Sequence, residues 1–210
     1  MCSDQSCLGY LLIIVVAVFA ILIYFSLKYR KTFLAQNLQL TADQVWQNVN
    51  IKTDHARIKK SDLLFGIQQD GSASTVIFVV KNFNNEVVGR IECRMGSHEY
   101  QIWVGSDLYR ISFLLSGWRS AQLTSDKAPS VLATYKMLNV LGKHEINIPG
   151  YGVLISERAT FINWLGVFRY RAAKNFIGLK QQISPTREIG KLVVLPPEIP
   201  LYLRIFILAL

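Results

Sequence analysis

The sequence predicts a mainly β chain with an N-terminal transmembrane helix, an antiparallel barrel or sandwich, and an apolar C-terminal helix. Three observations lead to this prediction. The run Leu8–Leu27 carries no charge, an alternation of apolar and polar residues begins near Leu63, and an apolar run follows three prolines at the end. The expected segments are a short non-cytoplasmic tail (1–7), a transmembrane helix (8–27), a basic juxtamembrane linker with a short helix (28–62) and a β-rich domain (63–210).

The uncharged run predicts a membrane anchor. Its twenty residues, LGYLLIIVVAVFAILIYFSL, would form a helix that spans the roughly 30 Å hydrocarbon core of a bilayer at about 1.5 Å per residue. A cleaved secretory signal is the alternative, but such a signal carries basic residues before its apolar run. Here Asp4 precedes the run, and the basic residues come after it: Lys28, Arg30 and Lys31. This order favours a retained anchor and, by the positive-inside tendency, places residues 28–210 on the cytoplasmic or equivalent side.

Length and charge favour one basic domain beside an anionic partner. The roughly 180 residues after the run suit a single domain. All 23 lysines and arginines lie there, and with 14 acids in the chain the formal net charge is +9. Each basic side chain near an anionic membrane contributes about 1 kcal/mol. Membrane lipids, phosphoinositides or other anionic headgroups, are therefore the expected partners, and nucleic acid is less expected.

The cysteines indicate a reducing compartment. Cys2, Cys7 and Cys93 form no C-x-x-C pair, so neither a disulfide framework nor a zinc site is indicated. Cys93 falls on the apolar side of an alternating segment and is interpreted as a small core residue. Cys2 and Cys7 flank the uncharged run, where acylation or cross-linking is an open alternative.

The first expected element after the anchor is a short helix over Ala42–Asn48, with Thr41 placed to cap it.

From about Leu63, β-branched and aromatic residues alternate with polar ones between turn residues, which is typical of an antiparallel meander. The asparagine-rich segment 82–85 is predicted as a tight turn, because asparagine tolerates positive φ.

About eight to ten strands are expected, which implies a closed barrel or a sandwich. The runs that carry strand signals are Thr75–Lys81, Glu86–Arg94, Glu99–Val104, Leu108–Leu115, Ser130–Leu138, Gly152–Ser156, Trp164–Arg171 and Gly190–Leu195. The stretch Gly117–Pro129 is predicted as a polar loop.

The chain ends in LPPEIPLYLRIFILAL, where the prolines stop the preceding strand and the run after them is apolar apart from Arg204. This run is too short to span a bilayer, so it is predicted as a buried helix or a final strand. The helix is favoured, because Leu203, Ile207 and Leu210 recur at helical spacing. The helix is expected to be enclosed.

Two segments resemble the tubby-like architecture, which includes tubby proteins, plant LURP-one-related proteins and phospholipid scramblases. They are VIFVVKNFNNEVVGRIE at Val76–Glu92 and the C-terminal LPPEIPLYLRIFILAL, and the resemblance covers roughly Leu63–Leu210. It implies a β-barrel threaded by an apolar C-terminal helix, and a phosphoinositide-binding or membrane-associated adaptor. The chain departs from scramblases in having its anchor at the N-terminus, and no ligand residue is carried over.

Basic residues without any acid occupy the segment from Arg158 to Arg187. The candidate anion-binding residues are Arg158, Arg169, Arg171, Lys174, Lys180 and Arg187, with aromatic residues between them. Arginine binds phosphate oxygens through two parallel hydrogen bonds and lysine acts as a point charge, which suits a lipid headgroup. The alternative is a solvated strand face with the aromatics in the core. Membrane topology alone explains the juxtamembrane cluster Lys28, Arg30 and Lys31.

No catalytic motif is found. His55, His98 and His144 lack the second histidine of a zinc-binding helix and are interpreted as surface or turn residues. Neither an enzyme nor a cofactor is expected. The predicted function is a membrane-anchored, non-catalytic β-domain that binds anionic lipid headgroups or a protein partner. The alternative is a structural accessory subunit of a larger membrane protein complex.

Overall fold

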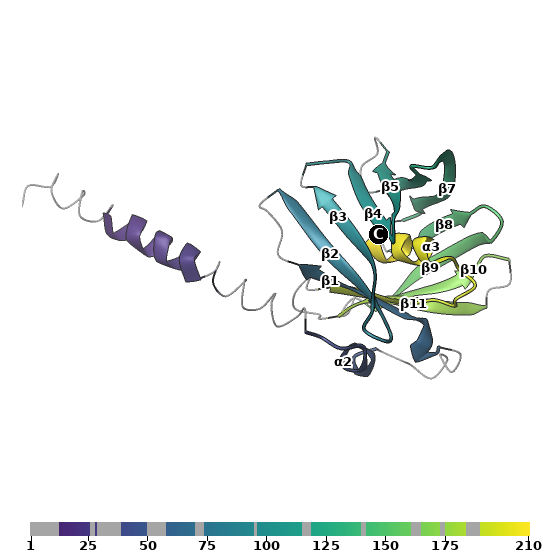
Figure 1. Ribbon diagram of the computed structural model, residues 1–210, viewed down its shortest axis with the longest axis horizontal. Helices are drawn as coiled ribbons and strands as arrows, with labels where there is room; N and C mark the ends of the chain where they lie inside the picture. Colours follow the sequence, from purple (N-terminus) through teal and green to yellow (C-terminus); the bar gives the residue numbers. More distant parts are fainter. Residues whose placement is uncertain are drawn as a thin grey trace, which may run out of the picture.

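Alternating apolar and polar side chains build the folded part of this chain into one closed sheet. The structure, a computed structural model, describes residues 13–25, 28, 39–49, 58–69, 74–94, 96–114, 119–139, 142–160, 165–172, 175–183 and 190–210. Within these residues, twelve antiparallel strands form a closed barrel around a C-terminal helix (Figure 1). The chain is therefore mainly β, and its sheet is a barrel rather than a sandwich.

Each strand pairs with the next one along the chain, and β1 pairs with β12 to close the barrel. The strands are β1 Leu63–Gln69, β2 Thr75–Asn82, β3 Val87–Arg94, β4 Glu99–Val104, β5 Asp107–Phe113, β6 Ser120–Ser125, β7 Ala128–Met137, β8 His144–Ile148, β9 Gly152–Thr160, β10 Leu165–Tyr170, β11 Phe176–Gln182 and β12 Gly190–Val194. The helices that accompany them are α2 Ala42–Gln47, the 3₁₀ turn η2 Lys60–Asp62 and α3 Leu201–Ala209.

The predicted strand count was too low, and the missed strands have different physical reasons. β6 lies inside Gly117–Pro129, which was wrongly predicted as a loop, because only its Ala121 and Leu123 are apolar and buried. In β11 the positions that face the barrel interior include Lys180, so the alternation that marks a strand is inverted. Apolar periodicity therefore fails where apolar residues are few or where a strand faces a polar cavity.

The short helix α2 packs on the outside of the barrel. Thr41 caps it as predicted, and Gln44 Oε1 accepts a hydrogen bond from the Thr41 backbone N–H at 2.9 Å. The Asn85 side chain, in the β2–β3 turn at φ 65°, accepts from the Ala42 backbone N–H at 2.6 Å. Ala42, Val45 and Val49 join an outer apolar cluster with residues of β1, β10, β11 and β12. Strand β1 is consequently buried on both faces over most of its length.

The predicted C-terminal helix is present and lies inside the barrel (Figure 1). Its residues 203–208 are all buried against the inner faces of the strands. Glycine makes room for it, because a Cβ on Gly89 would lie 2.6 Å from Ile205 Cδ1. Arg204 is the helix's charged residue, and its Nη2 donates to the Asp62 carbonyl oxygen at 2.6 Å. Burial lowers the pKa of Arg204 below its ordinary value.

Cys93 packs against the interior cluster, as expected of a small core residue. It is half-buried, and burial raises the pKa of its thiol to about 11. A thiol with such a pKa is almost wholly protonated near pH 7, so it is a poor nucleophile.

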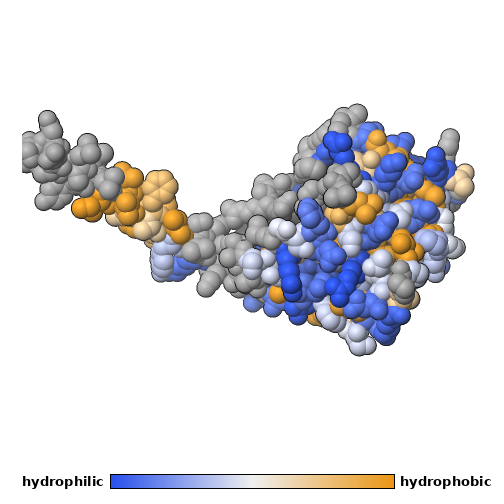
Figure 2. Space-filling view, turned by 90° about the horizontal axis from the view of Figure 1, so that it is seen from above, coloured by the Kyte–Doolittle hydropathy of each residue, from blue (hydrophilic) through white to orange (hydrophobic). Residues whose placement is uncertain are grey.

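Of the predicted anchor, residues 13–25 are helical and the remainder lies outside the described residues. Their large apolar side chains are 46% to 64% exposed (Figure 2). In the part of the chain that the structure describes, no helix is long and apolar enough to cross a membrane.

Replacing Gly89 by alanine should destabilise the barrel. The new methyl group would press on Ile205 of α3 and on the Trp103 carbonyl oxygen, 2.9 Å away, and such overpacking costs about 1–3 kcal/mol. Chemical denaturation should detect a loss of this size. The control is Val87→Ala on the same strand, where Val87 is 65% exposed and the change should stay within about 0.5 kcal/mol. Equal losses in both variants would contradict the tight packing of α3 against Gly89.

Candidate functional site

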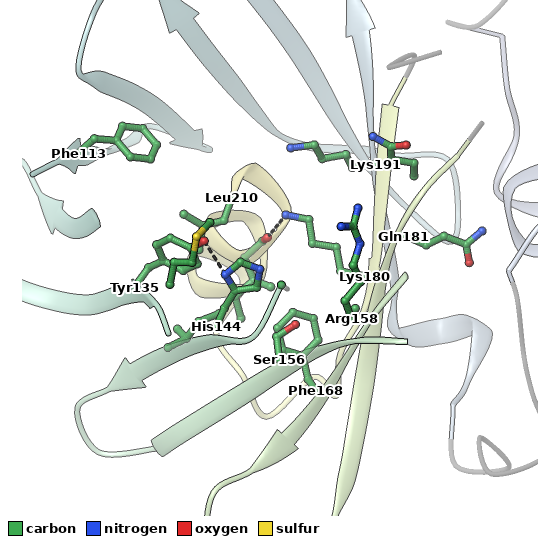
Figure 3. A pocket seen from close by; sticks show the side chains of 16 residues that line it. Phe113, Tyr135, His144, Ser156, Arg158, Phe168, Lys180, Gln181, Lys191 and Leu210 are labelled. Atoms are coloured by element: carbon green, nitrogen blue, oxygen red, sulfur yellow. Dashed lines mark hydrogen bonds between the residues drawn. The ribbon is translucent and has the colours of Figure 1, made fainter. Parts of the chain in front are cut away.

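A cavity of about 350 Å³ lies inside the barrel beside the C-terminal half of α3 (Figure 3). Side chains from β5, β7, β8, β9, β10, β11 and β12 line it, together with Ile207 and Leu210. Ligand pockets in proteins have volumes of about 300–1,000 Å³. The cavity is therefore large enough to hold a small ligand.

Three cationic side chains form one wall of this cavity: Arg158 of β9, Lys180 of β11 and Lys191 of β12. Strand register brings the first two together, because Gly166 of β10 pairs with Arg158 on one side and with Lys180 on the other. Residues in one row across neighbouring strands point to the same face of a sheet. We refer to Arg158, Lys180 and Lys191 as the cationic wall.

Glycines hold space open beside the cationic wall. A Cβ on Gly166 would lie 2.9 Å from the Ser156 Oγ. Gly142 lies in the β7–β8 loop with φ +89° and packs against the Arg158 side chain. A methyl group added at Gly142 would lie 3.0 Å from the Arg158 Cβ. Only glycine adopts that backbone conformation without strain and leaves the arginine stem in place.

The described residues that line the cavity include basic side chains and no carboxylate. Lys180 Nζ donates a hydrogen bond to the Ile207 carbonyl oxygen, 2.9 Å away, near the C-terminus of α3. Burial, and then repulsion by Lys191, hold the pKa of Lys180 well below its ordinary value. Lys180 and Lys191 are therefore close enough to influence each other's charge.

His144 and Tyr135 form a hydrogen-bonded pair on the cavity lining, with the Tyr135 hydroxyl 2.7 Å from His144 Nδ1. Burial raises the pKa of Tyr135 to about 12, so its hydroxyl is protonated. Burial, followed by the charges of Lys180 and Arg158, lowers the pKa of His144 below 6.5. The imidazole is therefore mainly neutral near pH 7. The interpretation of His144 as a surface or turn residue was wrong, because it lies in β8 and faces the interior.

The opposite wall of the cavity is apolar and aromatic. Phe113 of β5 and Tyr135 of β7 lie across the cavity from Lys180 and Lys191 (Figure 3). Met137 lies two residues beyond Tyr135 on β7, and Ile146 of β8 pairs with Tyr135, so both add aliphatic surface beside Tyr135. The cavity therefore presents cations on one side and, on the other, apolar side chains together with the Tyr135–His144 pair.

The structure divides the predicted basic residues between two faces of the sheet. Arg158 and Lys180 line the cavity, whereas Arg169 and Arg171 lie on the exposed outer side. Arg171 Nη1 is 3.0 Å from Glu145 Oε2. The pKa of Glu157 is lowered mainly by its hydrogen bond with Lys143 and to a smaller extent by the charge of Arg169. The outer pair is thus partly balanced by acids. Lys28 is exposed, and the remaining predicted cations lie outside the described residues: Arg30, Lys31, Lys174 and Arg187.

Sequence reasoning missed Lys191, His144 and Tyr135. The signal for Lys191 was a single lysine in the otherwise apolar strand GKLVV, at the position that alternates with Leu192. His144 and Tyr135 gave no local signal, because their pairing depends on strand register. Within the described residues, no group of three or more His, Cys, Asp or Glu side chains could hold a metal ion.

Comparison with protein-family models, curated proteins and solved structures finds no match for this chain. The arrangement of the site itself is therefore the basis for its chemistry. That arrangement suits the binding of an anion, since arginine and lysine side chains converge on a cavity that can be reached by water-sized molecules.

Stability should fall on acidification because of His144. In the unfolded chain the imidazole titrates near pH 6.5, above its lowered pKa in the folded protein. The unfolded chain then binds the proton first, so the free energy of unfolding decreases as the pH falls below about 6.5. Denaturant titrations should show a smaller decrease between about pH 7.5 and 5.5 in His144→Gln than in the wild type. Parallel curves for the two proteins would exclude His144 as the titrating group.

Proposed function

We propose that this protein is a single-pass membrane-anchored, non-catalytic β-domain that binds anionic lipid headgroups at the membrane surface. The observation that carries the proposal is the cationic wall. Arg158, Lys180 and Lys191 converge from three strands on one cavity, and the described lining contains no acid. Binding of an anion would offset the repulsion between Lys180 and Lys191.

The chemistry of the wall fits a phosphate or carboxylate headgroup. The Arg158 guanidinium can donate two parallel hydrogen bonds to such a group, and the lysines add point charge. An anion would also favour the ammonium form of Lys180, whose pKa is low in its absence. An anion on the wall would therefore raise the pKa of Lys180 toward its ordinary value.

The apolar N-terminal segment supports the proposed anchor. The helical residues 13–25 expose their large apolar side chains, and the adjoining described residue Lys28 is basic and exposed (Figure 2). Exposed apolar surface of this kind is unfavourable in water and is stabilised in a lipid phase. A tubby-like architecture is part of this proposal and is supported by a closed barrel that encloses an apolar C-terminal helix.

Glycerol 3-phosphate, the smallest anionic lipid headgroup, should bind to the full-length chain in phosphatidylcholine nanodiscs. Calorimetric titration should show binding that weakens with salt, and glycerol alone should not bind. The double variant Arg158→Gln/Lys191→Gln should lose at least about tenfold in affinity, since each charge-assisted hydrogen bond contributes about 1.5–3 kcal/mol.

The matched control is Arg169→Gln/Arg171→Gln, which removes the same charge from the outer face. Its affinity should stay within about twofold of the wild type, because long-range charge effects are screened beyond about 10 Å. If the outer variant loses more affinity than the cavity variant, the headgroup binds on the surface and not in the cavity. If neither the wild type nor any variant binds, the lipid-binding proposal is wrong.

Membrane retention tests the anchor separately. The full-length chain should stay in the membrane pellet after alkaline carbonate extraction, because a single apolar helix of about twenty residues is not released by charge disruption. Deletion of residues 8–27 should move the protein to the supernatant. Recovery of the intact chain in the supernatant would contradict the anchor.

A further inference from the structure

The two walls of the cavity differ in character, and this difference restricts the ligand. Arg158, Lys180 and Lys191 lie on one side, whereas Phe113 and Tyr135 lie on the other (Figure 3). A glycerol phosphate headgroup would satisfy the cationic wall but would place hydroxyl groups against the apolar wall. A neutral apolar ligand would remove water from the cations without supplying a negative charge in its place, which is costly.

The cavity volume restricts the ligand further. At about 30 Å³ per water molecule, 350 Å³ corresponds to roughly a dozen non-hydrogen atoms. A phospholipid with two long acyl chains is several times larger than this. A single chain of about ten carbons with one anionic head is of the right size.

We infer that the cavity binds a single-chain amphipathic anion, an acyl carboxylate or an alkyl phosphate, with its head on the cationic wall and its chain against Phe113 and Met137. The inference rests on the proposed function, since the head occupies the same wall, and it adds the chemical class of the whole ligand. The Arg158 guanidinium would hold the head through paired hydrogen bonds. Burial of the ligand's hydrocarbon chain would raise the affinity by about fourfold for each methylene removed from water.

A chain-length series tests the inference on the full-length protein in phosphatidylcholine nanodiscs, with the heats of empty discs subtracted. Affinity should rise by about fourfold per methylene from hexanoate to decanoate and should level off by tetradecanoate, whose chain exceeds the cavity. Decanol should bind at least about tenfold more weakly than decanoate, because it lacks the charge. Octyl phosphate, compared with octanoate, shows whether the site prefers a phosphate or a carboxylate head. Binding of either the alkyl phosphate or the acyl carboxylate supports the inference.

The apolar wall gives the variant that separates this inference from the proposed function. Phe113→Ala/Met137→Ala should lower the affinity for decanoate at least about tenfold and change that for glycerol 3-phosphate by less than about twofold. Should this variant fail to fold, the chain-length series on the wild type decides alone. Equal affinity for hexanoate and decanoate, or for decanol and decanoate, would overturn the inference. If glycerol 3-phosphate binds and decanoate does not, the inference is wrong and the proposed function stands. If neither ligand binds, both proposals are wrong.

Discussion

The enclosure of α3 by the barrel is the constraint on which the rest of this structure depends. An apolar helix with buried residues from 203 to 208 must be surrounded by side chains on every side. Twelve strands supply such a lining because alternate residues of each strand point inward. The fit also requires small residues at close approaches, and Gly66 and Gly89 provide them opposite Leu208 and Ile205. The interior is thus a packed core and the helix is part of it.

The cavity forms where this packing stops. α3 fills the barrel over most of its length, but beside Ile207 and Leu210 the inner faces of β7 to β12 carry polar and cationic side chains. Lys180 links the two regions, since it donates to the Ile207 carbonyl oxygen near the helix C-terminus. Carbonyl groups at that end of a helix are partly negative and stabilise a cation. One lysine therefore both satisfies the helix end and forms part of the cationic wall.

Burying basic groups inside a barrel opposes folding, because burial disfavours their charged forms. The lowered pKa values of Lys180 and His144 express this cost. Side chains that only stabilised the core would be apolar at these positions, as they are at Ile146 and Phe168 nearby. The outer cations Arg169 and Arg171 lie instead on the exposed face, where water solvates them and Arg171 pairs with Glu145.

Local pattern was sufficient for the β class, the capped helix at Thr41, the asparagine turn and the C-terminal helix. Each of these depends on residues that are neighbours in sequence, where side-chain periodicity and backbone preference act directly. The strands β1, β6, β8 and β11 were not singled out as separate runs. β1 is buried on both faces and does not alternate, β6 and β8 each bury only two apolar residues, and β11 turns Lys180 toward the cavity.

The candidate site was only partly predictable, because it depends on strand register. The charge pattern pointed equally to Arg158, Lys180, Arg169 and Arg171. Strand register decides that the first two face the cavity and the last two face solvent. Closure of the barrel then brought Lys191 and the Tyr135–His144 pair to the same cavity, since strands distant in sequence become neighbours only when β1 meets β12.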